Sequence, residues 1–401
     1  MNGIVIVGAG QTGASLAAKL RALGYQDSIT MIGEEPVPPY QRPPLSKGYL
    51  LGEMTLERLY LRGPSFWEDQ KITLQTGARV TAIDRTAKSV RAGGKSTPYD
   101  QLALATGSRP RRLPAAIGGD LIGVYTVRTL ADVDKMAPEF VKDRRLLVIG
   151  GGYIGLEAAA VGAKLGLQVT LIEMAPRILQ RVAAPETSDY FRKLHTDHGV
   201  TILENTGVDR LTGDGRVAGA VLSDGSEIAV DFVIVGVGIT PLTLLAEEAG
   251  LEIDNGIRTD EFGRTSDPSV WAAGDCASFP YKGGRTRLES VGNAIHQAES
   301  VAENMLGAGK SYEAKPWFWS DQYDVKLQIA GIGTGYDRIV TRGEGRAISF
   351  WYYSGDRLLA IDALNDARAY MIGKRLIEMG SSPDPAVITD PAADIRMLLK
   401  S

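Results

Sequence analysis

Hydrophobic residues in this chain gather in short runs that end at clusters of glycine. The stretch "IVIVGAGQTGASLA" (4–17) begins with such a run, passes through three glycines and continues into a segment typical of a helix. The stretch "LLVIGGGYIGLEAAA" (146–160) repeats the pattern. Each stretch therefore predicts a buried strand, a tight turn and a helix, which is how a dinucleotide-binding unit begins.

A second strand and an acidic residue follow each glycine cluster. "SITMIG" (28–33) precedes Glu34, and "QVTLIE" (168–173) ends at Glu173. In such fingerprints the first glycine permits the turn, the second lets a pyrophosphate approach the backbone, and the third lets helix and strand pack closely. The acidic residue accepts a hydrogen bond from the adenosine ribose. Chance glycine-rich turns are the alternative, but two complete copies favour two bound dinucleotides.

The acidic residue of the second copy bears on the choice of nicotinamide cofactor. A carboxylate at Glu173 repels a 2′-phosphate, and no arginine follows it directly. We therefore expect the second site to prefer NADH over NADPH. Arg177 and Arg181 lie close enough in the sequence to leave NADPH open.

Length, composition and charge narrow the class of protein. A chain of 401 residues suggests two or three domains. Hydrophobic residues at 44% and charged residues at 23% are typical of a soluble globular protein. The net charge is −4 and no segment is strongly basic, so we expect neither nucleic acid nor an anionic membrane as a partner.

The few cysteines and histidines restrict the chemistry further. The only cysteine is Cys276, so no intramolecular disulfide can form. In "LHTDHG", His195 and His198 lie three residues apart on a predicted helix. We interpret them as two solvated polar residues, with a zinc site as the alternative, and expect no metal centre.

We expect a cytoplasmic protein. The longest uncharged apolar run (232–246) contains Pro241 and is too short to span a bilayer. The first residues enter a strand almost at once, without the pattern of a secretory signal.

Five motifs occur in one order along the chain. They are "PYQRPPLSKGYL" (39–50), "LALATGSRPR" (102–111), "GGGYIGLE" (150–157), "VIVGVGITP" (233–241) and "VWAAGDCA" (270–277). This order resembles the FAD- and NAD-dependent ferredoxin reductases of bacterial oxygenase systems, the group of putidaredoxin reductase and the reductases of aromatic-ring dioxygenases. The resemblance covers nearly the whole chain, and "RPPLSK" is its most discriminating part.

The resemblance implies an α/β fold with two Rossmann-like dinucleotide-binding domains and a smaller α+β C-terminal domain. The FAD-binding domain would comprise residues 1–111 and 241–316, with the NAD-binding domain (112–240) inserted. The C-terminal domain would comprise residues 317–401. "ATGSRP" and "VGVGITP" would be the two crossings between the dinucleotide-binding domains.

Fingerprints and resemblance together assign the cofactor-binding residues. FAD binding is assigned to Gly8, Gly10, Thr12, Gly13, Glu34, Arg42, Lys47, Val80, Ala105, Thr106, Gly107, Arg128, Asp275, Val291 and Trp319. NAD binding is assigned to Gly150, Gly152, Tyr153, Ile154, Gly155, Glu157, Glu173, Arg181, Gly236 and Gly238. Asp275 would hold the ribityl hydroxyl groups, although a turn or helix cap is the alternative for that carboxylate.

The resemblance implies more specific positions for several of the other FAD-binding residues. Arg42 and Arg128 would hold the FAD phosphates or the flavin side of the site, with surface ion pairs as the alternative. Val80 would meet the adenine, and the backbone of Val291 would approach the isoalloxazine. Trp319 would lie near the flavin.

Lys47 and Glu157 are the implied catalytic pair, because both match family positions that form an ion pair beside flavin N5. Glu157 is expected on the first turn of the helix at the NAD site. The alternative is an exposed lysine and an unrelated glutamate favoured by the helix dipole. A further helix is predicted in "AIHQAESVAENML" (294–306), and its N-terminus could face the charge on reduced flavin.

The implied activity is hydride transfer from NADH to FAD, followed by single-electron transfer to a two-iron, two-sulfur ferredoxin. Docking would be transient and electrostatic, through Arg109, Arg111, Arg112, Arg285 and Arg287, unless these are merely solvated. We expect a monomer. A rubredoxin reductase and a signalling flavoprotein of the apoptosis-inducing kind remain alternatives. A disulfide reductase is disfavoured because Cys276 stands alone, where it is more simply a small residue near the FAD phosphates.

Overall fold

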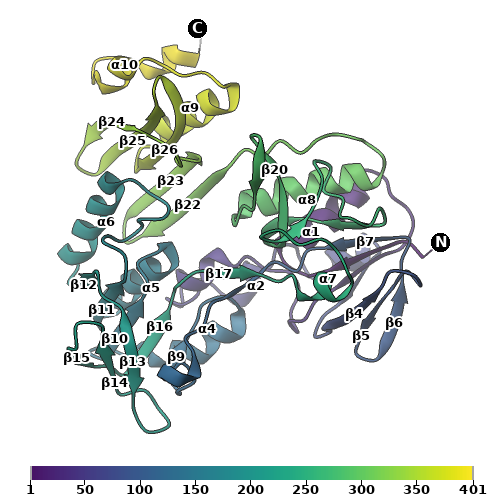
Figure 1. Ribbon diagram of the computed structural model, residues 1–401, viewed down its shortest axis with the longest axis horizontal. Helices are drawn as coiled ribbons and strands as arrows, with labels where there is room; N and C mark the ends of the chain where they lie inside the picture. The colour runs from purple at the N-terminus through teal and green to yellow at the C-terminus, as the bar shows by residue number, and fades with distance from the viewer. Residues whose placement is uncertain (1, 400–401) are drawn as a thin grey trace. The chain divides into compact units, whose positions relative to one another are not determined.

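The computed structural model describes residues 2–399 as two compact units (Figure 1). Unit 1 comprises residues 2–41, 56–109 and 239–316. Unit 2 comprises residues 42–55, 110–238 and 317–399. The boundaries at 109/110 and 238/239 fall within the two motifs predicted to cross between domains. The segment 42–55, which contains "RPPLSK", groups with unit 2.

Unit 1 is built on a parallel five-stranded sheet with the order β19-β7-β1-β2-β3. Its strands are β1 (Ile4–Val7), β2 (Ile29–Ile32), β3 (Ile72–Gln75), β7 (Gln101–Leu104) and β19 (Val270–Ala272). All four residues of β1 are buried, as expected for a central strand that is covered on both faces. Ile4 and Ile6 pack in one core with Leu16, whereas Val5 and Val7 pack in a second core.

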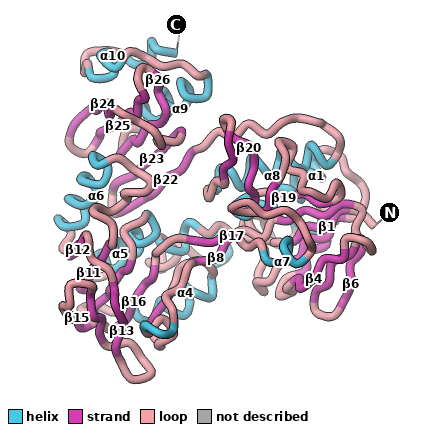
Figure 2. The backbone as a smooth tube through the Cα atoms, in the orientation of Figure 1, coloured by secondary structure: helices cyan, strands magenta, loops and turns pink. Residues whose placement is uncertain are grey.

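Two helices, α1 (Gln11–Ala22) and α8 (Val291–Met305), pack against each other in unit 1 and lie side by side in Figure 2. Three antiparallel strands form a separate small sheet: β4 (Val80–Asp84), β5 (Ser89–Ala92) and β6 (Lys95–Pro98). The remaining elements are α2 (Leu56–Leu59), α3 (Phe66–Asp69), β8 (Ser108–Pro110), β17 (Ile239–Pro241), α7 (Leu244–Glu248), β18 (Ile257–Arg258), the 3-10 helix Gly274–Cys276, β20 (Ala277–Tyr281) and β21 (Gly284–Thr286).

Helix α8 begins earlier than the predicted range 294–306. Ser290 is its N-cap, and the Ser290 hydroxyl accepts a hydrogen bond from the backbone N–H of Asn293 (3.2 Å). A capping serine of this kind satisfies one of the unpaired N–H groups in the first turn. The cap therefore places the start of the helix at Val291, and the helix ends at Met305.

Unit 2 contains a second parallel sheet, with the order β12-β11-β10-β16-β9. Its strands are β9 (Val124–Tyr125), β10 (Arg145–Ile149), β11 (Gln168–Glu173), β12 (Thr201–Glu204) and β16 (Phe232–Val235). Further elements are the 3-10 helices Pro43–Ser46, Ala115–Ile117 and Ala137–Glu139, α4 (Leu130–Met136), α5 (Tyr153–Lys164), α6 (Pro185–Asp197), β13 (Val208–Thr212), β14 (Gly219–Leu222) and β15 (Glu227–Ala229). The strand-turn-helix order repeats that of unit 1.

The C-terminal part of unit 2 is an antiparallel sheet with the order β22-β23-β26-β25-β24. Its elements are β22 (Trp317–Gln322), β23 (Val325–Gly331), β24 (Arg338–Glu344), β25 (Ala347–Ser354), β26 (Arg357–Leu364), α9 (Ala367–Met379), α10 (Pro385–Thr389) and the 3-10 helix Ile395–Leu399. Helix α9 packs on this sheet, and Ile372 and Leu376 share a core with Trp351 and Ile361. The predicted fold class, two Rossmann-like parts and a smaller α+β part, is confirmed.

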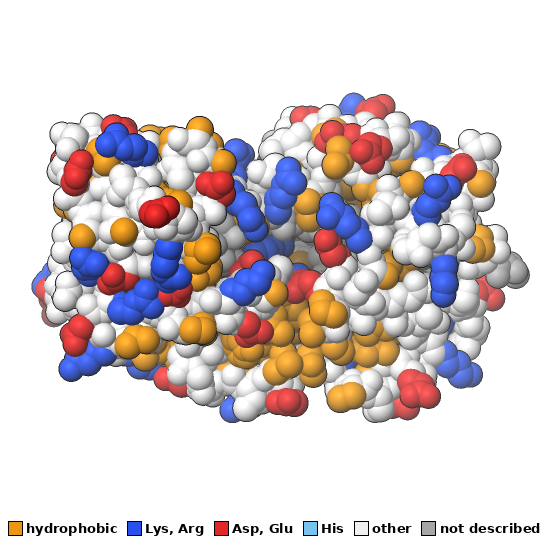
Figure 3. All heavy atoms as spheres, turned by 90° about the horizontal axis from the view of Figure 1, so that it is seen from below, with side chains coloured by type: hydrophobic (Ala, Val, Ile, Leu, Met, Phe, Trp, Pro, Cys, Tyr) orange, Lys and Arg blue, Asp and Glu red, His pale blue; other side chains and the backbone are white. Residues whose placement is uncertain are grey.

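Charges are mixed on the visible surface of the protein. On the face in Figure 3, Lys and Arg side chains alternate with Asp and Glu side chains on the part drawn at the left.

No helix within residues 2–399 combines the length and the apolar character needed to cross a membrane.

A buried carboxylate, that of Asp362, lies where the C-terminal sheet meets α6. Its Oδ2 accepts hydrogen bonds from the hydroxyl groups of Thr187 (2.7 Å) and Tyr352. The Tyr352 hydroxyl also accepts a hydrogen bond from the backbone N–H of Ala184 (2.9 Å). Burial raises the pKa of Asp362 to about 6, although the two hydroxyl groups act in the opposite direction. His195 of α6 is buried too, and burial lowers its pKa to about 4.

We expect Asp362→Asn and His195→Gln to change the pH dependence of stability in opposite directions. Native Asp362 holds its proton up to a higher pH than in the unfolded chain, so its contribution is lost as pH rises from about 4 to about 6. Native His195 stays neutral down to a lower pH, so its contribution is lost as pH falls from about 6.5 to about 4. Each contribution is on the order of 3 kcal/mol.

Urea unfolding between pH 4 and pH 7 measures this difference. The free energy of unfolding of Asp362→Asn should fall more steeply on acidification than that of the parent protein. For His195→Gln it should fall less steeply. The same slope in both variants would contradict the assignment of these two groups.

Candidate active site

The first glycine-rich turn joins β1 to α1 in unit 1. Gly8 has φ +115°, and a Cβ at that position would overlap the carbonyl oxygen of Ala105. A Cβ on Gly13 would overlap the carbonyl oxygen of Gly8. At Gly10, by contrast, a Cβ would meet no atom of residues 2–399 within 4 Å. The backbone is therefore tightly packed at Gly8 and Gly13, whereas there is free space beside Gly10. A pyrophosphate site requires this arrangement.

The second turn, between β10 and α5 in unit 2, has the same geometry. Gly150 has φ +106°, and its Cβ would overlap the carbonyl oxygen of Gly236. A Cβ on Gly155 would overlap the carbonyl oxygen of Gly150, and the side of Gly152 is open among residues 2–399. Within the same residues no side chain caps α1 or α5 and no acidic residue lies in either first turn. Both helix N-termini thus fit a phosphate group.

The acidic residue of each copy lies at the end of the second strand. Glu173 accepts hydrogen bonds from the backbone N–H groups of Gly151 (2.7 Å) and Ala175 (2.8 Å), so its carboxylate is held beside the second turn. Glu34 is more exposed and forms a 3.3 Å ion pair with Arg79. The latter contact was not anticipated from the sequence. Arg177 is occupied by hydrogen bonds to Ser188 and to the carbonyl oxygen of Gln180.

The remaining predicted NAD residues lie around the second turn. Tyr153 and exposed Ile154 open α5, and Gly236 and Gly238 follow β16. The guanidinium of Arg181 lies 3.7 Å from the Cβ position of Gly238. Unit 2 therefore brings these residues together.

The "GD" motif lies against the first turn in unit 1. The side chain of Thr12 contacts Gly274, and Asp275 accepts a hydrogen bond from the Ser108 hydroxyl (2.8 Å). Cys276 is buried, and its thiol donates to the carbonyl oxygens of Ala273 (3.3 Å) and Leu104 (3.5 Å). Burial raises the pKa of Cys276, which disfavours the thiolate needed for redox chemistry.

Other predicted FAD residues of unit 1 continue from the same strands. Thr106 follows β7, and its hydroxyl donates to the carbonyl oxygen of Leu242 (2.7 Å). The carbonyl oxygen of Gly107 accepts from the N–H of Leu242 (2.9 Å). Val80 opens β4 and packs on the second core of unit 1, and Val291 is the first residue of α8.

Lys47 and Glu157 form an ion pair within unit 2. Lys47 Nζ lies 2.8 Å from Glu157 Oε2, with the lysine side chain 19% exposed and the glutamate side chain 5% exposed. The prolines of "RPPLS" make a 3-10 helix, Pro43–Ser46, and Lys47 caps its C-terminal end. Glu157 is the fifth residue of α5, so the expectation that it lies on the first turn is wrong. Gly152 is the N-cap, and one turn of 3.6 residues ends before Glu157.

Four predicted FAD residues, Arg42, Lys47, Arg128 and Trp319, belong to unit 2 rather than unit 1. Arg42 donates a hydrogen bond to the backbone carbonyl of Arg128 (2.7 Å), so these two arginines are neighbours. Trp319 lies on β22 and stacks on Trp317, with ring centroids 5.5 Å apart. Phe318 points to the other face of the strand, where its ring lies 4.9 Å from that of Tyr153.

Two other interpretations need correction. His195 is fully buried and hydrogen-bonded to Gln322, so it is not a solvated residue. Arg285 and Arg287 are not free docking arginines, because they donate to the backbone carbonyls of Thr259 and Asn255. The composition of the chain cannot predict which arginine side chains donate hydrogen bonds to backbone carbonyl oxygens.

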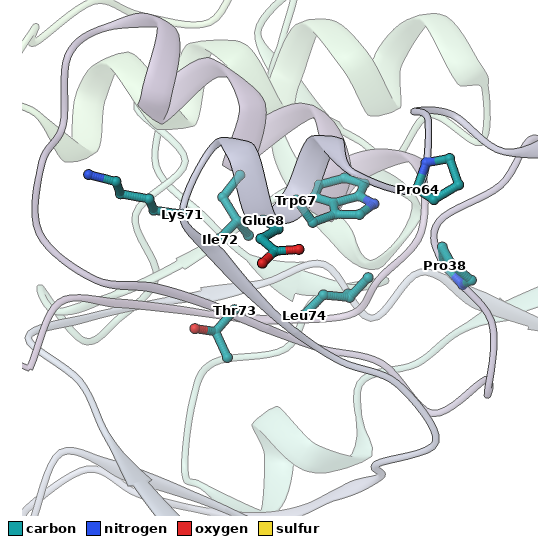
Figure 4. A pocket seen from close by; sticks show the side chains of 8 residues that line it. All are labelled: Pro38, Pro64, Trp67, Glu68, Lys71, Ile72, Thr73 and Leu74. Atoms are coloured by element: carbon teal, nitrogen blue, oxygen red, sulfur yellow. The ribbon is translucent and has the colours of Figure 1, made fainter.

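A shallow pocket of about 560 Å³ lies elsewhere in unit 1, at the edge strand β3 (Figure 4). Its lining includes Pro38, Pro64, Trp67 and Leu74. None of the residues that line it belongs to a glycine-rich turn or to the predicted cofactor-binding set. The pocket is therefore separate from the candidate site.

Sequence reasoning missed two hydroxyl groups that contact Glu157. The Ser46 hydroxyl donates to Glu157 Oε2 (2.7 Å), and the Ser320 hydroxyl donates to Glu157 Oε1 (2.6 Å). Ser46 directly precedes Lys47 in the sequence, which is only a weak indication that its hydroxyl contacts Glu157. Ser320 and Phe318 lie on one face of β22, so strand periodicity indicates a shared face but not the partner.

Comparison with known proteins decides the family. Residues 2–298 match the family described as pyridine nucleotide-disulphide oxidoreductase, and residues 317–399 match the reductase C-terminal family. The chain belongs to the pyridine nucleotide-disulphide oxidoreductase family.

Several members of this family are similar over nearly their whole length. Putidaredoxin reductase of Pseudomonas putida is 41% identical over 99% of this chain and 96% of its own. A ferredoxin–NAD(P)+ reductase of Sphingomonas is 45% identical over 97% and 95%. The crystal structure of a covalent putidaredoxin reductase–putidaredoxin complex matches with a TM-score of 0.96 at 40% identity, covering 99% of this chain and 98% of that one. The predicted resemblance and the expectation of an FAD- and NAD(H)-dependent oxidoreductase are confirmed.

Proposed function

We propose that this chain is an NADH-dependent ferredoxin reductase that supplies electrons to an oxygenase. When bound, FAD would supply the conversion of a two-electron hydride from NADH into single electrons for a two-iron, two-sulfur ferredoxin. The similarity to putidaredoxin reductase and to a ferredoxin–NAD(P)+ reductase supports this choice of partner over rubredoxin and over a signalling role.

One observation carries the proposal: the chain has two matched dinucleotide turns but a single, buried cysteine. A disulfide reductase stores its electrons in a pair of cysteines, which this chain does not have. The thiol of Cys276 is hydrogen-bonded to two backbone carbonyls, so it cannot serve as a relay. The lack of an internal disulfide store supports the transfer of electrons from NADH to a separate carrier.

The side chains have distinct parts in this proposal. Gly10 and the N-terminus of α1 bind the pyrophosphate of FAD, and Gly152 and the N-terminus of α5 bind that of NADH. The ion pair of Lys47 and Glu157 would supply fixed charge at the reacting end of the nicotinamide. Asp275 accepts hydrogen bonds from the ribityl chain. We also propose the three-domain division at 1–111 with 241–316, 112–240 and 317–401, and a cytoplasmic monomer.

A ferredoxin panel tests the function. The purified protein should be yellow, NADH should bleach it without oxygen, and one ferredoxin class should support NADH-driven reduction of cytochrome c. Because docking is electrostatic, the rate with ferredoxin should fall at high salt. Flavin that NADH cannot bleach, or bleaching with no ferredoxin reduced across the panel, would reject the proposal.

We expect Glu173→Ala to lower the preference for NADH over NADPH by roughly tenfold. The carboxylate that repels a 2′-phosphate is lost, and so is a charge-assisted hydrogen bond, worth about 1.5–3 kcal/mol, to the NADH ribose. The ratio of kcat/KM for the two cofactors measures this effect. Glu204→Ala, which removes a carboxylate at the end of the neighbouring strand β12, is the control and should leave the ratio unchanged.

A further inference from the structure

A continuous series of buried hydrogen bonds leads from α6 to the ion pair of Lys47 and Glu157. All of its members belong to unit 2. Ser320 Oγ lies 2.6 Å from Glu157 Oε1, and Gln322 Nε2 lies 3.1 Å from Ser320 Oγ. His195 Nε2 lies 2.7 Å from Gln322 Oε1, and the Tyr323 hydroxyl lies 3.3 Å from His195 Nδ1. We call Ser320, Gln322 and His195 the relay residues.

Each donor in this series is determined by its neighbour. An ionised carboxylate only accepts, so Ser320 must donate its hydroxyl hydrogen to Glu157. The Ser320 oxygen then accepts from the amide NH₂ of Gln322, which turns the Gln322 carbonyl oxygen toward His195. A carbonyl oxygen also only accepts, so His195 carries its hydrogen on Nε2. Nδ1 of the neutral ring is left to accept from Tyr323.

All four bonds therefore point toward Glu157. Hydrogen bonds aligned in this way polarise one another, so the series strengthens the hydrogen bond that Ser320 donates to the Glu157 carboxylate. The relay residues are 0–1% exposed, so water does not compete with the three bonds that join His195, Gln322, Ser320 and Glu157. The neutral state of His195 that the series requires agrees with the lowering of its pKa by burial.

The two oxygens of Glu157 are held from opposite sides. Oε2 is held by Lys47 and Ser46, from the segment that precedes α2. Oε1 is held by Ser320, from the first strand of the C-terminal sheet. Without Ser320 the carboxylate would lose the contact that fixes its rotation about the Cγ–Cδ bond, and the ion pair with Lys47 would be held less firmly.

We propose that Ser320, Gln322 and His195 are positioning residues that keep the Glu157 carboxylate oriented toward Lys47, so that the C-terminal sheet helps to shape the reacting site. This inference rests on the proposed function, in which the Lys47 ammonium acts beside the nicotinamide. The relay residues act through their series of hydrogen bonds to Glu157.

The test measures how firmly Lys47 is held, in the oxidised holoenzyme and without NADH. Acetylation of Lys47 by an activated ester is followed by peptide mass spectrometry, and flavin reduction by NADH is followed in a stopped-flow instrument across pH. In Ser320→Ala we expect acetylation about tenfold faster and flavin reduction about tenfold slower, with a changed pH profile, because a hydrogen bond to a charge is lost. Gln322→Leu interrupts the series one hydrogen bond farther from Glu157. We expect acetylation about threefold faster and flavin reduction about threefold slower in this variant.

The control is Ser349→Ala. Ser349 is equally buried in the same sheet, but its hydroxyl contacts Trp351 and not Glu157. Both rates should stay within about twofold of the parent in this variant. A Lys47 acetylation rate in Ser320→Ala equal to that of Ser349→Ala would overturn the inference.

A double-mutant cycle shows whether His195 acts through Ser320. In the parent protein, His195→Leu should make acetylation about threefold faster and flavin reduction about threefold slower. In the Ser320→Ala background the same substitution should change neither rate, because the series is already interrupted. Fully additive effects would reject the relay. The acetylation result does not depend on electron transfer, so it stands or fails separately from the ferredoxin assay.

Discussion

The Lys47→Ala protein should keep its FAD and reduce it with NADH about 100- to 1,000-fold more slowly than the parent, the usual cost of losing one preorganised electrostatic group. The ammonium of Lys47 is held 2.8 Å from Glu157 in a largely buried position, where its field is weakly screened. Loss of the ammonium removes positive potential at the reacting end of the nicotinamide and leaves Glu157 without its cationic partner. Stopped-flow absorbance at the flavin band measures the rate, and the bound flavin is counted after denaturation.

Lys164→Ala is the matched control for this variant. Lys164 is the last residue of α5, the helix that carries Glu157, and it pairs with Glu53 at 2.8 Å. Both of these side chains are more than half exposed, so the pair contributes little. The control should reduce its flavin within about twofold of the parent rate. Unchanged reduction kinetics in Lys47→Ala would remove the lysine from the mechanism.

The second large effect is expected from Gly155→Ala, which should lower kcat/KM for NADH roughly 100-fold while the FAD content stays the same. A Cβ on Gly155 would overlap the carbonyl oxygen of Gly150, which is backbone and cannot rotate away. Helix α5 must therefore shift from β10, and a shift of about 1 Å in a positioned group costs on the order of 100-fold in rate. Steady-state kinetics at varied NADH concentration measure the change.

Gly207→Ala controls for the general effect of adding a methyl group to unit 2. The nearest atom to a Cβ on Gly207 is 3.8 Å away, which is an ordinary contact. This variant should keep the parent kcat/KM for NADH. Equal values for Gly155→Ala and Gly207→Ala would show that the second turn does not need its third glycine.

The parts of the site that sequence reasoning anticipated are those encoded within a few neighbouring residues. Gly8 and Gly13, like Gly150 and Gly155, occupy positions where a side chain would meet the backbone of the same turn or of the strand beside it. This steric requirement leaves a spacing that is visible in the sequence. The acid at the end of the next strand follows from the same unit, and Glu173 indeed holds the second turn.

Other parts of the site could not be anticipated, because they join segments far apart in the chain. Glu157 meets Ser46 and Ser320, which are 111 positions before it and 163 positions after it. Serine is a common surface residue, and neither one lies in a glycine fingerprint. His195 looked like a solvated residue of a polar helix, but the C-terminal sheet buries it.

By itself the sequence determined the two dinucleotide-binding units, their order and the absence of a redox disulfide. These properties depend on short-range sterics and on the presence of one cysteine, so they need no knowledge of packing. Only the tertiary structure decided which polar groups surround Glu157, that Arg285 and Arg287 turn to backbone carbonyls, and that Asp362 and His195 are buried. Burial and pairing of a polar side chain depend on its neighbours in space, and those neighbours come from distant segments.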